Sequence, residues 1–541
     1  MASEHSKEMA RGAFWSIAGQ LGIKLIGFFY LVILARMASQ DDVGTFYLAL
    51  SIFGVLSVFS DAGFTSSFGR YVPYLLAKGE KAKLRALLNV SYIIVTVLCV
   101  ALGLIILLGA DVIAGYFHNP QLALPLKLLS PYLLLNTLFT LDTSFLSGRK
   151  MMKEYSTLLN AQTLAKFVLT LLFFFIIGAT MFSIAASFLL SFILVLVLSF
   201  IYLRKPLADL GHDIAHVDMG AFLLEVVPFG LMMTTINSLW MLVNYTDRIL
   251  IGYMMAPSVA AQMVAVYSLA TGVSMLVMLF PNAISLIFFP MISELVGQGK
   301  NEAVIELCET CIRWIIFVTF PLTLVMLVFP DSILRMFYGD SYVVGATALA
   351  IFTLGLFFRA LSTVESLVLG SMRLLKIELK VALVCAVLNV ILNVLFIPPY
   401  GIDGAAVASA IAFLASAILF VYYARKHMGF RFPPEMLKSL LAGVIALGII
   451  LLIKPYLTQA ISALPALGTG DTALLLAKTM RLSALAMLFI VSGLVYVGLL
   501  FGLKSFSHED IAILSDTLKR VKVPGDWADR ITAVFQRGVH S

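Results

Sequence analysis

Charge is scarce in this sequence. Only 12% of its 541 residues are Asp, Glu, Lys or Arg, whereas 61% are hydrophobic and the mean hydropathy is +1.01. A soluble globule of this size would have too little polar surface to present to water. The composition therefore excludes a soluble enzyme or binding module and predicts a chain that lies in a bilayer.

Reactive and metal-binding side chains are also few. Four cysteines give no disulfide framework, and the seven histidines never show a metal-ligand spacing. Cys308 and Cys311 form a single CxxC, which we interpret as structural because no second pair or histidine accompanies it. No P-loop is present, so the chain carries no nucleotide-driven motor of that kind. We expect no catalytic residue, no metal and no cofactor.

Apolar runs of roughly 18 to 27 residues recur along the chain, the length that crosses the hydrocarbon core as a helix. Isolated strands would leave backbone groups unsatisfied in lipid, so these runs are predicted to be helices. The predicted fold is an all-α polytopic membrane protein with about fourteen transmembrane helices. They are expected at residues 13–37, 43–69, 84–110, 124–147, 156–178, 181–203, 222–252, 259–290, 311–330, 345–370, 377–397, 403–424, 437–456 and 480–502.

Lys and Arg gather in the loops on one side of these helices. That side holds Lys7, Arg11, Lys78, Lys81, Lys83, Arg85, Arg149, Lys150, Lys153, Arg204, Lys205, Lys300, Arg373, Lys376, Lys380, Arg425, Lys426, Arg431 and Lys438. The positive-inside rule then predicts a multi-pass protein of the plasma (inner) membrane with both termini in the cytoplasm. The same asymmetry accounts for the net charge of +7, so no nucleic-acid partner is expected.

The membrane architecture occurs twice, in residues 13–203 and again in residues 222–424, with an offset of roughly 220 positions. Tyr47 and Tyr267 open corresponding helices, and Pro73 and Pro290 close them. Internal repeats of this kind are typical of transporters.

Charged side chains nevertheless occur inside predicted helices, where each costs at least roughly 2.5 to 3.5 kcal/mol and usually faces a wet cavity. They are Lys24, Asp61, Asp142, Lys166, Asp247, Arg248, Arg359 and Glu365. Arg70 and Arg149 lie nearer the cytoplasmic ends, where snorkelling to the headgroups is an equal explanation.

Polar side chains extend these charges into stripes along single helix faces. Ser16, Gln20 and Lys24 are spaced by four, and Asn389 lies one turn before Asn393. Any one stripe could simply join helices together. Several stripes together favour a hydrated central cavity.

Four segments resemble the polysaccharide transport family, the group of O-antigen-type flippases. These are residues 12–16, 61–64, 245–252 and, most specifically, 397–406. The family shares a superfamily with multidrug and toxin extruders and lipid II flippases, and the resemblance spans residues 10 to 500. Pro399, doubled after Pro398, and an extended turn at residues 256–262 depart from the pattern without touching a charged position.

The resemblance implies two pseudo-symmetric six-helix lobes that rock about a central cavity in alternating access. The lobes would be residues 1–210 and 211–430, followed by helices 13 and 14 (residues 431–504) and a cytoplasmic amphipathic tail (residues 505–541).

The cargo that the resemblance implies is an oligosaccharide on polyprenyl phosphate or pyrophosphate, with undecaprenol or dolichol as the lipid. It would pass from the cytoplasmic to the outer leaflet. The cations expected to bind its phosphates are Lys24, Lys166, Arg248, Arg359, Arg70 and Arg149. The carboxylates expected to couple H⁺ or Na⁺, or to act in gating, are Asp61, Asp142, Asp247 and Glu365. Asp247 and Arg248 could instead neutralise one another. A polysaccharide polymerase or glycosyltransferases are candidate associates, together with membrane lipid.

Two other functions compete with a flippase. A multidrug or toxin antiporter of the same superfamily would share the duplication but would be expected to have twelve helices and a pocket dominated by carboxylates. A membrane glycosyl polymerase or ligase would need a large extramembrane segment for acid–base chemistry. The longest gap, at residues 457–479, has Asp471 as its only carboxylate, which argues against an enzyme.

Overall fold

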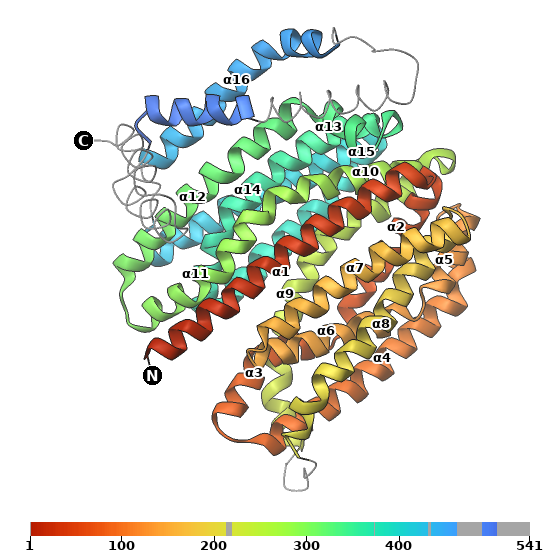
Figure 1. The fold of residues 1–541 in the computed structure, drawn as a ribbon, viewed down its shortest axis with the longest axis vertical. Helices are drawn as coiled ribbons and strands as arrows, with labels where there is room; N and C mark the ends of the chain where they lie inside the picture. Colours follow the sequence, from red (N-terminus) through yellow and green to blue (C-terminus); the bar gives the residue numbers. More distant parts are fainter. Residues whose placement is uncertain (1, 212–218, 373, 431–433, 463–489, 506–541) are drawn as a thin grey trace. The chain divides into compact units, whose positions relative to one another are not determined.

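The computed structural model describes residues 2–211, 219–372, 374–430, 434–462 and 490–505. Within these ranges every regular element is a helix, which confirms the all-α fold class (Figure 1). The α-helices are α1 (Ala2–Met37), α2 (Gln40–Ser60), α3 (Phe64–Ala77), α4 (Lys81–Tyr116), α5 (Ala123–Leu128), α6 (Tyr132–Gly148), α7 (Met152–Ile176), α8 (Met181–Ala208), α9 (Met219–Met254), α10 (Pro257–Ser274), α11 (Leu279–Gly297), α12 (Asn301–Val328), α13 (Pro330–Phe337), α14 (Ala346–Ser371), α15 (Leu375–Met428) and α16 (Pro434–Ser462). Short 3₁₀ helices are η1 (Pro120–Leu122), η2 (Met275–Met278) and η3 (Asp340–Gly345).

Eleven helical segments of the described chain are long and apolar enough to cross a membrane, or twelve if one bent pair counts as a span. The 54 residues of α15 would extend about 80 Å, well beyond one span. Gly401 interrupts this helix with a φ of 57°, between the predicted spans 377–397 and 403–424. The short apolar helix Ile490–Gly502 overlaps the last predicted span, of which residues 480–489 lie outside the described ranges. The count of fourteen is compatible with these helices and stays a prediction.

Three predicted spans are interrupted rather than continuous. The span predicted at 43–69 breaks between α2 and α3, where Ala62 and Gly63 have φ values of 47° and 87°. The span predicted at 124–147 is the bent pair, with an angle of 42° at its break. The span predicted at 259–290 passes through η2. Hydropathy continues across all three breaks, so an apolar pattern alone gives no sign of them.

Local chemistry explains several helix ends. The Ser39 hydroxyl accepts the Asp42 N–H at 3.1 Å where α2 begins, and the Thr180 hydroxyl accepts the Ser183 N–H at 3.3 Å where α8 begins. Gly429, with a φ of 73°, ends α15 in the left-handed conformation that favours glycine.

The chain divides into two compact units. The first comprises residues 1–273 and 378–412, and within it α1 and α8 both pack along α7, while α2 packs along α9. The second comprises residues 274–377 and 413–541, and there α12 packs against α14 and α16 around a buried apolar cluster. Cys308 and Cys311 lie inside that cluster, as their structural interpretation requires.

The predicted lobes of residues 1–210 and 211–430, and the helix pair within residues 431–504, stay predictions. The amphipathic tail predicted for residues 505–541 lies outside the described residues from position 506 onward.

Candidate functional site

The most connected polar group of the first unit is Asp247, near the end of α9. Its side chain is 2% exposed and accepts four hydrogen bonds. The donors are the Tyr267 hydroxyl (2.5 Å), the Ser409 hydroxyl (2.6 Å), and the amides of Asn393 (2.7 Å) and Asn389 (3.2 Å). Asp247 therefore joins α9 to α10 and to both halves of α15.

This cluster also has unused acceptors. The amide oxygens of Asn389 and Asn393 are buried and have no hydrogen-bond partner. A carboxylate beside two free amide oxygens is the kind of oxygen-rich environment that a small hard cation prefers. The sequence had marked the stacking of the two asparagines. It gave no sign that they meet Asp247, which lies 142 and 146 positions earlier in the chain.

Arg248 turns away from its neighbour Asp247. Its guanidinium donates to the Ser268 hydroxyl at 3.0 Å, the Asn244 carbonyl oxygen at 3.0 Å and the Thr271 hydroxyl at 3.4 Å. All three acceptors are neutral, and no ion pair joins residues 247 and 248. The alternative that these two charges neutralise one another thus finds no direct ion pair in the structure.

Lys24 on α1 and Lys166 on α7 belong to a closely packed helix pair, and both are half-buried. The Lys166 ammonium lies 4.5 Å from the centroid of the Tyr30 ring, a cation–π contact. Within the described ranges neither lysine has a carboxylate oxygen within 4.0 Å of its ammonium. Neither cation therefore forms an ion pair with a described carboxylate.

Asp142, in contrast, is fully engaged. Its buried carboxylate accepts the Tyr92 hydroxyl of α4 and, at 2.5 Å, the Ser199 hydroxyl of α8. The sequence predicts neither partner, because a lone hydroxyl in an apolar helix gives no sign of a partner 50 or 57 positions away. Asp142 ties α4, α6 and α8 together.

Asp61 stands at the break between α2 and α3. Its carboxylate accepts the backbone N–H of Thr65 at 2.9 Å and the Thr65 hydroxyl, and thereby caps α3. The Thr234 hydroxyl of α9 donates to it at 3.4 Å. Asp61 thus stabilises the break between α2 and α3, which hydropathy did not predict.

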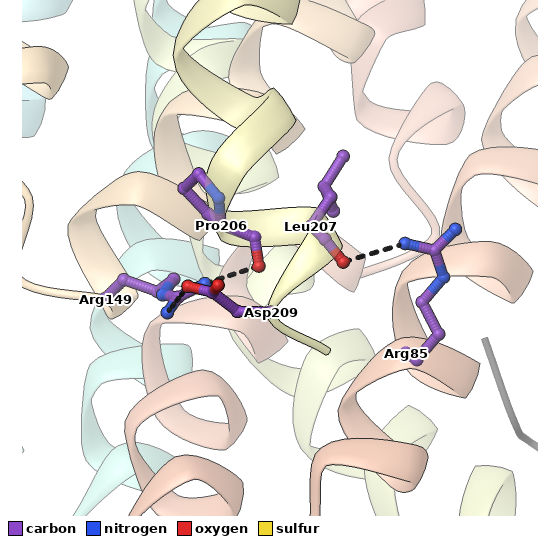
Figure 2. A network of polar contacts seen from close by, with 5 residues as sticks. All are labelled: Arg85, Arg149, Pro206, Leu207 and Asp209. Carbon is purple, nitrogen blue, oxygen red and sulfur yellow. Dashed lines mark hydrogen bonds and ion pairs between the residues drawn. The ribbon is translucent and has the colours of Figure 1, made fainter. Parts of the chain in front are cut away.

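Two arginines bind the carboxyl end of α8 (Figure 2). Arg149 donates to the Pro206 carbonyl oxygen at 2.6 Å and contacts the Asp209 carboxylate at 3.5 Å. Arg85 donates to the Leu207 carbonyl oxygen at 3.4 Å. Cations at a helix carboxyl terminus satisfy free carbonyl groups and complement the helix dipole. This arginine clamp occupies Arg149, one of the predicted phosphate ligands.

Arg70, on α3, also has a contact of its own. Its guanidinium carbon lies 4.4 Å from the centroid of the Phe229 ring of α9. This predicted ligand therefore packs on an aromatic ring where α3 meets α9.

The remaining predicted residues belong to the second unit. Glu365 is 2% exposed, and neither of its carboxylate oxygens has a hydrogen-bond partner in the part of the chain described. Arg359 donates to the Ser362 hydroxyl at 3.4 Å. Arg313, which the sequence pattern did not single out, is 5% exposed and donates to the Thr310 hydroxyl at 3.2 Å. No group of three His, Cys, Asp or Glu that could hold a metal occurs among the described residues.

Known proteins match this chain along most of its length. It is 21% identical to an uncharacterised membrane protein of Methanocaldococcus jannaschii, over 95% of this chain and 100% of the relative. It is 22% identical to a Shigella flexneri protein named for O-antigen transport, over 76% of this chain and 96% of the relative. The solved structure of the lipid II flippase MurJ in an inward closed conformation superposes with a TM-score of 0.67 at 18% identity, covering 89% of this chain and 98% of that one. This last likeness concerns the fold.

Two family models also match. The MatE model covers residues 228–395, and the model described as polysaccharide biosynthesis protein covers residues 9–296, more than half of the chain. The resemblance drawn from the sequence is confirmed: this multi-pass membrane protein belongs to the polysaccharide biosynthesis protein family.

Proposed function

We propose that the protein is a flippase that moves a polyprenyl-(pyro)phosphate-linked oligosaccharide from the cytoplasmic to the outer leaflet by alternating access. One observation carries the proposal. In the first unit Lys24 and Lys166 have no carboxylate oxygen within 4.0 Å of their ammonium groups among the described residues, and Arg248 donates to neutral acceptors, whereas the carboxylates of the same unit are engaged by hydroxyl and amide donors.

A cation at membrane depth without a counter-ion is costly, and such residues commonly mark the path of a charged substrate. Carboxylates in the same unit do not supply the counter-charge, because Asp61, Asp142 and Asp247 bind other groups. A visiting phosphate or pyrophosphate would supply it through charge-assisted hydrogen bonds. The name of the Shigella flexneri relative, which refers to O-antigen transport, supports a glycan as the remainder of the cargo.

The sugar and polyprenol parts of the proposed substrate also have suitable surroundings. Sugar hydroxyls cannot enter hydrocarbon without polar partners. Side chains such as Thr234, Asn237 and Asn244 on α9 would offer exchangeable hydrogen bonds to them. The polyprenol tail would stay in lipid throughout.

Direction would come from the membrane potential and a coupling ion. With the cytoplasm negative and both termini cytoplasmic, outward movement of an anion releases about 2.3 kcal/mol per charge per 100 mV. Of the carboxylates in the first unit, Asp247 is the strongest candidate to bind H⁺ or Na⁺, because the unused oxygens of Asn389 and Asn393 lie beside it. Glu365 is the corresponding candidate in the second unit.

An ion-coupled multidrug or toxin antiporter is the second candidate. It is favoured by the MatE match over residues 228–395, a range that contains Asp247 and both asparagines. An antiporter would confer resistance to cationic drugs on a drug-sensitive host, and a flippase would not.

The test uses the full chain in proteoliposomes with a fluorescent oligosaccharide on undecaprenyl pyrophosphate, and measures the fraction that becomes accessible to a glycosidase outside. The flippase predicts protein-dependent movement that is lost in Lys166→Met. Lys127→Met is the matched control, because Lys127 is an exposed lysine paired with Asp111 at 2.8 Å. Absence of movement in the native protein, together with drug resistance in cells, would replace the flippase by the antiporter.

A further inference from the structure

The guanidinium of Arg248 is held on each of its three nitrogen atoms. Nε donates to the Ser268 hydroxyl at 3.0 Å, and Nη2 donates to the Thr271 hydroxyl at 3.4 Å. Nη1 donates to the carbonyl oxygen of Asn244 at 3.0 Å, one turn earlier on α9. The two hydroxyls lie on α10, so acceptors on two helices fix both the position and the plane of the guanidinium.

The two hydroxyls of α10 are well suited to accept hydrogen bonds from an arginine. The Thr271 hydroxyl donates its own proton to carbonyl oxygens of α10, those of Tyr267 at 2.7 Å and Ser268 at 3.2 Å. Its lone pairs are therefore left for the guanidinium. Ser268 is 3% exposed and Thr271 is 1% exposed, so water does not compete with Arg248 for these oxygens.

The residues next to this arrangement fix how α9 and α10 lie against one another. The Tyr267 hydroxyl donates to the Asp247 carboxylate at 2.5 Å, so two successive residues of α10 bind two successive residues of α9. Both halves of α15 also donate to Asp247. The backbone that carries Arg248 is therefore anchored beside Ser268.

Arg248 keeps donors that no described residue uses. A guanidinium has five N–H groups. The three hydrogen bonds use one on each nitrogen, which leaves one N–H on each terminal nitrogen. A bidentate contact with two phosphate oxygens uses two such groups. Asn244 is exposed and Arg248 is half-buried, and polar groups in this position at membrane depth usually face a wet cavity.

We propose that Ser268 and Thr271 are positioning residues, which hold Arg248 so that its two remaining N–H groups form a fixed pair of donors for a phosphate group. In the proposed function, on which this inference rests, Arg248 binds the phosphate of the cargo. A long side chain that is already held in place loses less freedom when its ligand arrives. Loss of the hydroxyls should therefore weaken binding of the phosphate and leave binding of the lipid tail unchanged.

Equilibrium binding to the full chain in detergent tests this role. The probes are farnesyl pyrophosphate, a short polyprenyl pyrophosphate, and farnesol, which has the same tail without the charge. Ser268→Ala/Thr271→Val should raise the Kd of farnesyl pyrophosphate at least about fivefold, the effect of freeing one long side chain, and should leave the binding of farnesol unchanged. Thr271→Ser keeps the hydroxyl and should bind both probes as the native protein does.

Two buried hydroxyls of α12 provide the matched control. Thr319 donates to the carbonyl oxygen of Ile315 at 2.6 Å, and Thr323 donates to that of Thr319 at 2.8 Å. Both threonines are 2% exposed or less, like the two hydroxyls of α10. Thr319→Val/Thr323→Val should therefore bind both probes as the native protein does.

A double-mutant cycle separates positioning from packing, because hydroxyls between helices can also serve packing alone. In an Arg248→Met background the loss of both hydroxyls should cause no further loss of farnesyl pyrophosphate binding, since no guanidinium remains to be held. An equal fold-loss in both backgrounds overturns the proposal, as does native binding by the folded hydroxyl variant. If the double variant does not fold, Thr271→Val alone, which keeps the side-chain shape, should raise the Kd at least about twofold in the native background and not in Arg248→Met.

These binding measurements need no transport. The expected losses of binding, in a protein that moves no oligosaccharide in proteoliposomes, would leave the positioning residues standing and refute the flippase. If the native protein binds farnesyl pyrophosphate no more tightly than farnesol, the positioning role is overturned, and flipping in proteoliposomes decides the proposed function separately.

Discussion

Charged side chains at membrane depth differ in what surrounds them. In the first unit Asp142 and Asp247 accept hydrogen bonds from helices far apart in the sequence, so each contributes to packing. Lys24 and Lys166 have no carboxylate oxygen within 4.0 Å of their ammonium groups in the described ranges. Residue type and helical spacing located these charges, but only the contacts separate the carboxylates that join helices from the lysines that have no carboxylate partner in the described ranges.

Lys166→Met should reduce flipping at least about tenfold, the equivalent of ~1.4 kcal/mol, because the phosphate loses a charge-assisted partner. Lys166→Arg, which keeps the charge, should retain more activity than Lys166→Met. Flipping in proteoliposomes and abundance in the membrane are measured together. Equal loss of abundance and flipping in Lys166→Met would indicate a structural lysine.

Asp247→Ala should destabilise the protein by at least about 3 kcal/mol, because buried donors of Tyr267, Asn389, Asn393 and Ser409 lose their acceptor. Thermal unfolding in detergent measures the change. Asp111→Ala removes an exposed pair with Lys127 and should change stability by less than about 1 kcal/mol. Equal stability of the two variants would contradict the role assigned to Asp247.

Helices were predicted more reliably than their interruptions. Ranges such as 181–203 and 222–252 correspond to α8 and α9, because apolar length determines what can span a bilayer. The break after Asp61 was not predicted, since it depends on two residues with positive φ and on a carboxylate cap. The arginine clamp on α8 was also not predicted, because Arg149 and its acceptor Pro206 are 57 positions apart.

Arg149→Met should lower stability by about 1 to 2 kcal/mol through loss of the carbonyl and carboxylate contacts at the end of α8. Thermal unfolding and membrane abundance should both fall, with flipping per folded molecule retained. If flipping per molecule falls while stability is unchanged, Arg149 binds substrate, as the sequence had predicted, and the clamp is secondary.

At the scale of the whole molecule, the two copies of the repeat have charged residues within their predicted helices at different positions. Lys24 and Lys166 belong to the first copy, and Arg248 and Arg359 to the second, at positions that do not correspond. The strong polar ties of Asp142 and Asp247 each stay within one copy. The fold repeats along the chain, and the charged side chains within it do not.

Flipping should therefore respond to voltage. Imposing a potential that is negative on the cytoplasmic side should favour outward movement by about 2.3 kcal/mol per charge per 100 mV. Proteoliposomes with a potassium gradient and valinomycin measure the effect, and liposomes without valinomycin serve as the control. Indifference to potential and to H⁺ and Na⁺ gradients alike would refute this drive.

The sequence by itself determined that the chain lies in a membrane, that its fold is helical, that its architecture is repeated and to which family it belongs. The length of the apolar segments, the scarcity of charge and the order of the motifs can all be read directly along the chain. Only the tertiary structure decided that Asp247 and Arg248 bind different partners, that Asp142 joins three helices, and that Gly54 of α2 packs against the Tyr245 ring of α9. These features depend on which residues meet across long sequence separations. The periodicity of side chains within one helix does not predict which side chains of another helix they contact.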